Sequence, residues 1–284
     1  MENKIKYLEF EEAFKTLIDF AMQNNFNNIE TIKWIVVKVL RLKRDQFDKI
    51  AKVSIQQVED MIIALKRHIN GETLGKIFGF IEFHGNFFNV TENVFDPRLS
   101  TEALVDAVVE TNTSKKQDVK IIDLCTGSGC VAITLSKILS KKVDAIDISP
   151  LALEIARENN LKNKANVNFF EMDLNQDWNK YLSNKYDIIV SNPPYWDAEK
   201  ILKNIDVVKS NPLEGFDGGE DGLRFIKRII EISPDFLNPN GELFLEIEPD
   251  QENNVRKILE NNFCDIKTFL DYRNITRVIS AKLK

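Results

Sequence analysis

Hydrophobic residues in the first quarter of the chain recur at the three- and four-residue spacing of a helix. Residues 4–24 carry this pattern, which returns over residues 29–42 and 54–69. Ser54 stands at the start of the third segment, where a hydroxyl is a good N-cap. We therefore predict that residues 1–78 form a small helical bundle.

The pattern changes where this bundle ends. Residues 77–83 and 86–90 are rich in aromatic and β-favouring side chains, and Gly79 and Gly85 interrupt them. These features favour a β-hairpin, and we assign residues 79–91 to a hairpin that joins two domains.

From residue 92 onward, short apolar runs alternate with helical patterns. This alternation is typical of an α/β fold in which helical crossovers connect parallel strands. We expect seven strands, at residues 119–124, 142–148, 167–172, 187–191, 242–247, 265–270 and 277–282. Residues 92–284 are therefore predicted to form a doubly wound, Rossmann-like, mostly parallel sheet with an antiparallel hairpin at one edge.

Composition places the chain among ordinary globular proteins. It has 284 residues, of which 43% are hydrophobic and 29% charged, enough for about two domains. We find neither an apolar run of the ~20 residues that span a membrane nor a signal-peptide core near the N-terminus. The three cysteines form no Cys-x-x-Cys pair. We therefore expect a cytoplasmic protein with reduced thiols.

Charge and histidine content exclude several kinds of chemistry. The net charge is −6, made up of +2 in residues 1–78 and −8 in the remainder, which argues against binding nucleic acid mainly through phosphates. The cationic stretch from Lys33 to Lys52 is either a solvated helix face, which we favour, or a docking surface for an acidic partner. With His68 and His84 alone, we expect no histidine-built metal site and no histidine-based triad.

A glycine-containing loop follows the first predicted strand. Cys125-Thr126-Gly127-Ser128-Gly129 leads into helical sequence, and glycines in this place let a ligand approach the backbone at a helix N-terminus. A plain tight turn is the alternative. Asp147 ends the second strand, where its carboxylate would accept hydrogen bonds from ribose hydroxyls. Asp173, with Leu174 after it, ends the third strand, where it would bind an adenine amino group or serve as a turn residue.

The fourth predicted strand runs directly into Asn192-Pro193-Pro194-Tyr195. Each proline fixes its own φ and has no N–H group, so the turn is stiff and offers acceptors but almost no donors. Such a corner suits an –NH2 group whose nitrogen must keep its lone pair free, although an ordinary proline turn would have the same sequence. A dinucleotide and S-adenosylmethionine would both suit the glycine loop. A dehydrogenase also needs a proton-transfer residue that is not evident here, so we favour N-methyl transfer.

Taken in order, the motifs resemble those of the release-factor glutamine methyltransferases. Asp123–Gly129 is similar to that family's cofactor loop and Ser191–Tyr195 to its catalytic motif. Asp96–Glu102 resembles its Pro-Arg-x-x-Thr-Glu segment, and Gly218–Leu223 and Gly241–Ile247 resemble its later blocks. Asn-Pro-Pro-Tyr alone is shared with adenine and guanine N-methyltransferases, but the other blocks and the helical N-terminal domain narrow the resemblance.

The resemblance implies a class I methyltransferase that moves a methyl group from S-adenosylmethionine to the side-chain amide nitrogen (N5) of a glutamine. That glutamine lies in the Gly-Gly-Gln motif of peptide chain release factors, and residues 1–78 would dock the substrate protein. We expect a monomer without stable nucleic-acid or membrane binding. The implied catalytic residues are Asn192, Pro193, Pro194 and Tyr195, and the implied substrate-binding residues are the same four together with Arg98. The implied cofactor-binding residues are Asp123, Cys125, Thr126, Gly127, Ser128, Gly129, Asp147, Asp173, Leu174 and Asn192.

Some residues depart from the family pattern. Cys125 replaces a glycine, Trp196 an aliphatic residue, and Asn211 a glutamate. Arg98 is expected to contact either the substrate or a nearby acid, and Tyr195 either to stack on the substrate amide or to fill the core. One rival function is N-methylation of an adenine or guanine amino group in DNA or rRNA. The other is a non-catalytic interaction protein that keeps a degenerate methyltransferase fold.

Overall fold

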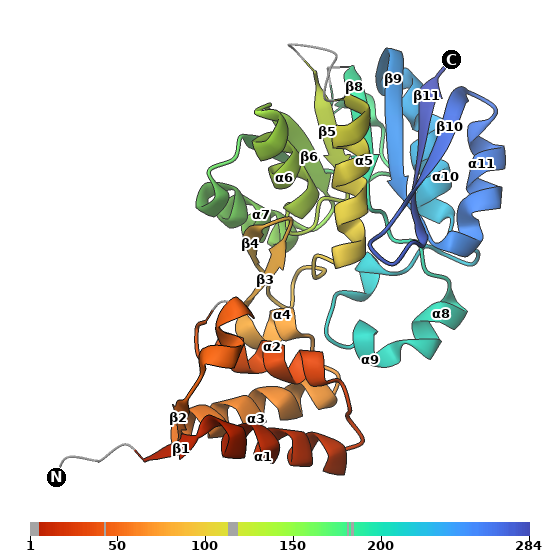
Figure 1. Cartoon of the computed structure of the whole chain (residues 1–284). Helices are drawn as coiled ribbons and strands as arrows, with labels where there is room; N and C mark the ends of the chain where they lie inside the picture. The colour runs from red at the N-terminus through yellow and green to blue at the C-terminus, as the bar shows by residue number, and fades with distance from the viewer. Residues whose placement is uncertain (1–5, 43, 113–118, 181, 183–184) are drawn as a thin grey trace. The chain divides into compact units, whose positions relative to one another are not determined.

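The computed structural model describes residues 6–42, 44–112, 119–180, 182 and 185–284. The chain divides into two compact units, Met1–Phe78 and Gly79–Lys284 (Figure 1). The division falls where the helical pattern gives way to aromatic, β-favouring sequence.

Within its described residues, 6–42 and 44–78, the first unit contains the α-helices α1 (Phe10–Gln23), α2 (Ile29–Val39), α3 (Ile55–Ile69) and α4 (Leu74–Phe78). They pack around one apolar cluster that includes Leu17, Ile35 and Met61. Ser54 caps α3 in a reciprocal capping box with Gln57, as a hydroxyl at this position predicts.

The expectation of a helix from residue 4 is wrong at its start. Strand β1 (Tyr7–Glu9) precedes α1 and pairs antiparallel with β2 (Lys52–Ser54). Three residues are too few to show the alternation that identifies a strand, and the pairing partner lies far away in the sequence. Residues 4 and 5 of that expectation, and Lys43 of the cationic stretch, lie outside the described residues. Lys33 pairs with Glu30 on its own helix, as on a solvated face.

The second unit begins with the predicted hairpin, formed by β3 (Phe80–Phe83) and β4 (Asn86–Asn89). His84 and Gly85 form its tip with φ values of 48° and 71°, the positive pair that a tight two-residue turn requires. Phe83 and Phe88 are buried in the core of the second unit. The hairpin therefore packs within the second unit.

The predicted seven-stranded sheet is present, in the order β10-β11-β9-β8-β5-β6-β7. Strands β9, β8, β5, β6 and β7 are parallel, and β11 runs antiparallel to both β9 and β10. The bounds are β5 (Ile121–Leu124), β6 (Val143–Asp147), β7 (Val167–Glu171), β8 (Tyr186–Ser191), β9 (Leu237–Glu246), β10 (Phe263–Leu270) and β11 (Thr276–Leu283). Strand β9 starts at Leu237, five residues before the predicted position. The prediction missed this start because Asn238-Pro239-Asn240-Gly241 is typical of a turn. In the structure, the pairing of β9 with β8 shifts register across these residues.

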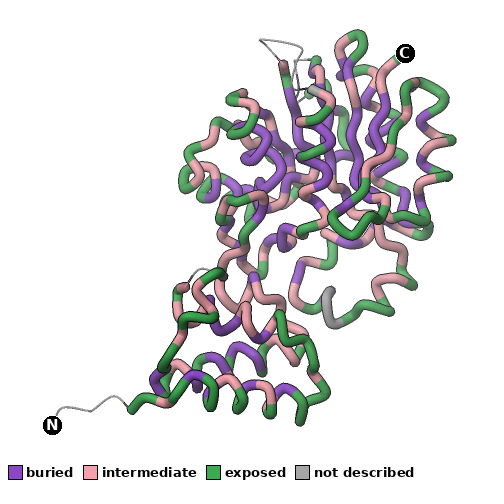
Figure 2. The backbone as a smooth tube through the Cα atoms, viewed as in Figure 1, coloured by how far each residue is buried: buried purple, intermediate pink, exposed green. Residues whose placement is uncertain are grey.

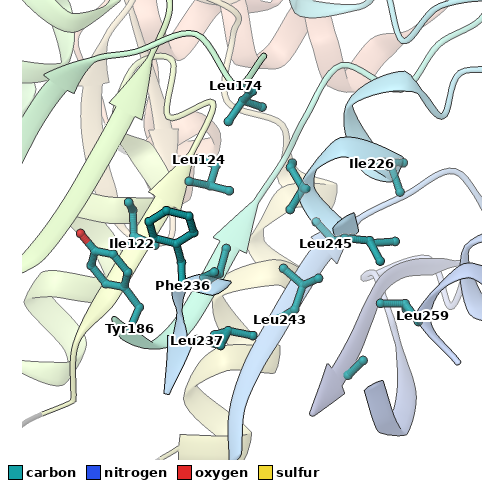
Figure 3. Packing of buried hydrophobic residues seen from close by; sticks show 14 of the residues in the cluster. Ile122, Leu124, Leu174, Tyr186, Ile226, Phe236, Leu237, Leu243, Leu245 and Leu259 are labelled. Atoms are coloured by element: carbon teal, nitrogen blue, oxygen red, sulfur yellow. The ribbon is translucent and has the colours of Figure 1, made fainter. Parts of the chain in front are cut away.

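Helices cover both faces of this sheet. Figure 3 shows Ile226 of α10 (Arg224–Phe236) beside Leu243 and Leu245 of β9, in the cluster that α11 (Glu252–Leu259) also joins. The opposite cluster contains Phe244 and the helices α5 (Glu102–Asn112) and α6 (Cys130–Leu139), with α7 (Pro150–Asn163) packed beside α6. The short helices α8 (Ala198–Lys203) and α9 (Ile205–Val208) follow β8.

Strands β5 and β8 are buried on both faces, and Figure 2 shows them within the purple interior. The chain passes from β5 to β6 and β7 on one side, then returns to β8 on the other. Open α/β sheets bind ligands at the carboxyl edge beside such a reversal. The glycine loop after β5 and the Asn-Pro-Pro-Tyr corner after β8 lie at this edge.

Candidate active site

Asp123 holds the glycine loop from beneath. Its side chain is fully buried, and Oδ2 accepts hydrogen bonds from Thr126 Oγ1 (2.6 Å) and from the Ala132 N–H in the first turn of α6 (3.2 Å). Burial raises the pKa of Asp123 to about 7, although both hydrogen bonds act to lower it. Asp123 therefore shapes the loop from within the protein.

Glycine suits the two loop positions, 127 and 129, for different steric reasons. Gly127 and Gly129 both adopt positive φ values, of 55° and 80°. A Cβ on Gly129 would lie 3.0 Å from Ile133 Cδ1 and 3.2 Å from Ala156 Cβ, so this glycine permits close packing. A Cβ on Gly127 would meet nothing within 4 Å. The backbone at Gly127 therefore presents an open surface beside the N-terminus of α6, as ligand approach requires.

Cys125 keeps the backbone conformation that glycine favours, with φ at 59°. A non-glycine residue in this region costs about 1 kcal/mol or more. Burial, together with the charges of Asp147 and Asp123, raises the pKa of the thiol well above its ordinary value, so it stays protonated. The neighbouring Ser191 acts in the opposite direction, and its hydroxyl donates a hydrogen bond to the Leu124 carbonyl, next to Cys125 in the chain.

Asp147 fixes the other side of the loop. Its Oδ2 accepts a hydrogen bond from the Gly127 N–H (2.8 Å), and Oδ1 accepts one from the Ser149 N–H (2.9 Å). Burial raises its pKa, while these two hydrogen bonds oppose the rise. A carboxylate has about four acceptor positions, so Asp147 keeps room for ligand hydroxyls.

Asp173 and Leu174 are placed less directly. Asp173 Oδ1 accepts hydrogen bonds from the backbone and side-chain nitrogens of Asn175, at 2.8 and 3.0 Å, which is the turn role considered from the sequence. The Leu174 side chain is buried in the sheet core. The Asp173 charge nevertheless acts on Cys125, which puts it beside the loop.

In the Asn-Pro-Pro-Tyr corner, the Asn192 side chain is oriented by Thr101. Asn192 Nδ2 donates a hydrogen bond to Thr101 Oγ1 at 3.2 Å. Because the nitrogen end of the amide is held in this way, its oxygen end is the one available to a substrate. Pro193 after it is buried.

A buried carboxylate joins the parts of this corner. Glu246 at the end of β9 is fully buried, and its Oε1 accepts a hydrogen bond from Tyr195 Oη at 2.9 Å. Burial raises the pKa of Glu246 to about 7, while the neighbouring Thr101 hydroxyl, the Tyr195 hydrogen bond and the charge of Arg277 act to lower it. Oε2 itself has no hydrogen-bond partner. Glu246 thus ties Tyr195 to the sheet and lies close to Thr101, which holds Asn192.

The Gly218–Gly222 block packs directly on this corner. The Gly218 N–H donates to the Trp196 carbonyl at 2.8 Å, and Gln251 Nε2 donates to the Tyr195 carbonyl at 2.8 Å. A Cβ on Gly222 would lie 2.5 Å from the Tyr195 carbonyl oxygen. Glycine is required here because two stretches of backbone touch.

Three further residues discussed from the sequence have partners in the structure. Trp196 Nε1 donates to Glu248 Oε1 at 2.9 Å, and its ring lies 4.7 Å from that of Phe216. Asn211 Oδ1 accepts a hydrogen bond from the Asp96 N–H at 3.0 Å. Trp196 and Asn211, two of the departures from the family pattern, therefore have structural partners. The Arg98 guanidinium lies over the Phe95 ring, 5.0 Å from its centroid, and burial lowers its pKa.

Comparison with known proteins identifies relatives along nearly the whole chain. This chain is 37% identical over 230 residues to the release factor glutamine methyltransferase of Bacteroides thetaiotaomicron, and the matched region covers 80% of each protein. The protein of that name from Thermodesulfovibrio yellowstonii is 33% identical and matches 90% of this chain and 93% of its own. The chain belongs to the release factor glutamine methyltransferase family.

Two further comparisons concern the methyltransferase fold of the second unit. A family model described as "Methyltransferase small domain" matches residues 92–206. The T. thermophilus 16S rRNA N2 G1207 methyltransferase, solved in complex with AdoMet and guanosine, shares the fold. Its TM-score is 0.54 at 18% identity, over 72% of this chain and 50% of that one. In the ranges that the structure describes, no helix has the length and apolar character to cross a membrane.

Sequence reasoning named the loop, Asp147 and the corner, but it gave no role to Thr101, Glu246 or Gln251. Thr101 and Glu246 do lie inside the motif blocks Asp96–Glu102 and Gly241–Ile247. Those blocks were the one signal that marked them.

Replacing Gly222 should displace the Tyr195 backbone, in addition to the loss of stability that a side chain at a positive φ causes. Gly222 and Gly85 have similar φ values, +68° and +71°, but a Cβ on Gly85 would meet nothing within 4 Å. We expect Gly85→Ala to lose about 1 kcal/mol of stability and keep full methyl transfer. Gly222→Ala should lose at least tenfold in methyl transfer. Equal losses of transfer in the two variants, measured with labelled cofactor, would contradict the packing argument.

Ionisation of Glu246 should be visible in the free energy of unfolding. Its ordinary pKa is 4.5 and its folded pKa is about 7, so between these values the unfolded state binds fewer protons than the folded state. Stability from this group is therefore lost as pH rises from about 4.5 to about 7.

Glu246→Gln removes that titration while keeping the shape of the side chain. The difference in unfolding free energy, wild type minus variant, should fall over this pH range and level off above it. Denaturant titrations at several pH values measure the difference, and a flat difference would rule out a buried, protonatable Glu246.

Proposed function

We propose that the protein transfers a methyl group from S-adenosylmethionine to the side-chain amide nitrogen of a glutamine, in the Gly-Gly-Gln motif of a peptide chain release factor. The observation that carries this proposal is the orientation of Asn192. Its nitrogen end is held by Thr101, so its oxygen end is left as an acceptor at the ligand-binding edge of the sheet. Relatives with this named activity match most of the chain and support the assignment.

The residues present fit the cofactor that the family uses. The open backbone at Gly127 would accept its amino acid portion, and the remaining acceptor positions of Asp147 would bind its ribose hydroxyls. Thr126, Ser128 and Gly129 complete the loop. Asp173 and the backbone of Leu174 would contact the adenine. When bound, S-adenosylmethionine supplies a methyl carbon that its positively charged sulfur has already activated.

The corner prepares the amide nitrogen for methylation. An amide nitrogen shares its lone pair with its carbonyl group, which makes it a poor nucleophile. Asn192 Oδ1 and the Pro193 carbonyl would accept its two N–H groups, so that the nitrogen is oriented and gains electron density. Orientation can contribute roughly 7–11 kcal/mol at best, and acceptors near the developing positive charge stabilise the transition state. Pro193 and Pro194 have no N–H group that would compete for these acceptors.

The remaining parts of the corner exclude water and need no general base. Tyr195 is anchored through its hydroxyl by Glu246, so its ring is fixed where it would stack on the flat substrate amide. The methylated nitrogen carries a positive charge and releases its proton readily. Both histidines lie elsewhere, His68 in α3 and His84 at the hairpin tip.

We also infer how the enzyme meets its substrate. The helical unit, residues 1–78, would dock the release factor, and Arg98 would contact it near the corner. The net charge of −8 over the catalytic portion disfavours a nucleic-acid substrate. We expect a monomer that works in the cytoplasm, where release factors act.

Asn192→Ala should abolish transfer while cofactor affinity stays nearly intact. Loss of one positioned group of this kind typically costs 10²–10³ in rate. Methyl transfer from labelled S-adenosylmethionine to purified release factor measures turnover, and calorimetry measures cofactor binding. The matched control is Asn204→Ala, which makes the same substitution at an exposed residue at the end of α8. Retained turnover in Asn192→Ala, or label that maps to DNA or rRNA instead of the glutamine, would refute the proposal.

Thr101 should be required for the orientation of Asn192. Thr101→Val removes the acceptor for Asn192 Nδ2, and we expect kcat to fall about tenfold with unchanged cofactor affinity. Thr101→Ser keeps the hydroxyl and should restore most of the activity. If Thr101→Val retains the wild-type kcat, the oxygen end of Asn192 is not oriented by this bond.

A further inference from the structure

Asn159 of α7 connects two segments that are distant in the sequence. Its side chain is fully buried. Nδ2 donates one hydrogen bond to the Asn89 carbonyl and one to the Ser128 carbonyl, both at 3.0 Å. Oδ1 accepts a hydrogen bond from the Asn89 N–H at 2.7 Å. Asn89 ends strand β4 of the hairpin and Ser128 lies in the cofactor loop, so one amide group bridges the two.

The same face of α7 holds the hairpin at further points. Residues three and four positions apart share a helix face. Lys162 Nζ donates to Asn89 Oδ1 at 2.6 Å, and Asn163 Nδ2 donates to the Phe87 carbonyl at 3.1 Å. These two residues contact the hairpin, whereas Asn159 contacts the hairpin and the loop.

We propose that Asn159 is a positioning residue that couples cofactor binding at the glycine loop to docking of the β3–β4 hairpin. The inference requires only that this loop binds S-adenosylmethionine, and it holds whatever the methyl acceptor is.

The physical reason is hydrogen-bond satisfaction in a buried place. Both donors of the Asn159 amide and one of its acceptor positions are used, all on backbone groups. A shift of the loop or the hairpin would leave buried polar groups unsatisfied, which disfavours the shifted state strongly. The loop conformation and the docked hairpin therefore stabilise each other. Coupling of this kind is reciprocal, so a ligand that orders the loop also strengthens hairpin docking.

Hydrogen exchange on the full-length wild-type chain tests the coupling without any substitution. The probe is S-adenosylhomocysteine, which has the cofactor's binding groups and no methyl group to transfer. We expect the amides of the loop and of Asn86–Asn89 to exchange more slowly with the probe bound. Amides of the edge pair β10–β11 are the internal control and should be unchanged. Slower exchange in the loop with no change in the hairpin would overturn the proposal.

A pair of variants on α7 gives the second test. Asn159→Ala removes all three bridging bonds, and we expect at least tenfold weaker binding of S-adenosylhomocysteine by calorimetry. Asn163→Ala removes a hairpin contact that does not reach the loop, and should bind within about twofold of wild type. Affinity within twofold of wild type in Asn159→Ala would overturn the proposal. If Asn159→Ala fails to fold, the wild-type exchange experiment decides.

Discussion

The active corner depends on one buried carboxylate. Glu246 lies within the sheet, where Tyr195 donates a hydrogen bond to it and the neighbouring Thr101 acts to lower its pKa. A buried polar group without partners is costly, so these contacts fix the corner as well as satisfy the carboxylate. Thr101 in turn holds the nitrogen end of Asn192. In the proposed mechanism, Thr101 therefore directs the oxygen that Asn192 presents, and Glu246 of the buried sheet fixes the ring of Tyr195.

The glycine loop after β5 is likewise held by carboxylates. Asp123 accepts hydrogen bonds from Thr126 in the loop and Ala132 in α6, and Asp147 accepts one from Gly127. Cys125 adopts a backbone conformation that glycine favours, and Ser191 at the end of β8 donates a hydrogen bond to the Leu124 carbonyl at the end of β5. The glycine loop and the Asn-Pro-Pro-Tyr corner thus follow two paired strand ends, and Asn159 connects the loop to the hairpin.

Sequence patterns predicted what depends on local order. Strands buried on both faces, such as β5 and β8, appear as continuous apolar runs, and the loop and the corner follow them immediately. The patterns failed where structure depends on distant partners. Strands β1 and β2 are three residues each and exist through pairing with each other. Thr101 and Asn192 are 91 residues apart, Asn89 and Asn159 are 70 apart, and Tyr195 and Glu246 are 51 apart. No periodicity within one sequence marks such pairs.

The most direct test of this account is a crystal structure of the protein with S-adenosylhomocysteine and a release-factor peptide containing Gly-Gly-Gln. The account predicts that the glutamine side-chain nitrogen lies within hydrogen-bond distance of Asn192 Oδ1 and the Pro193 carbonyl, with Asn192 Nδ2 still on Thr101. A glutamine bound away from Asn192, or an Asn192 side chain turned away from Thr101, would contradict it.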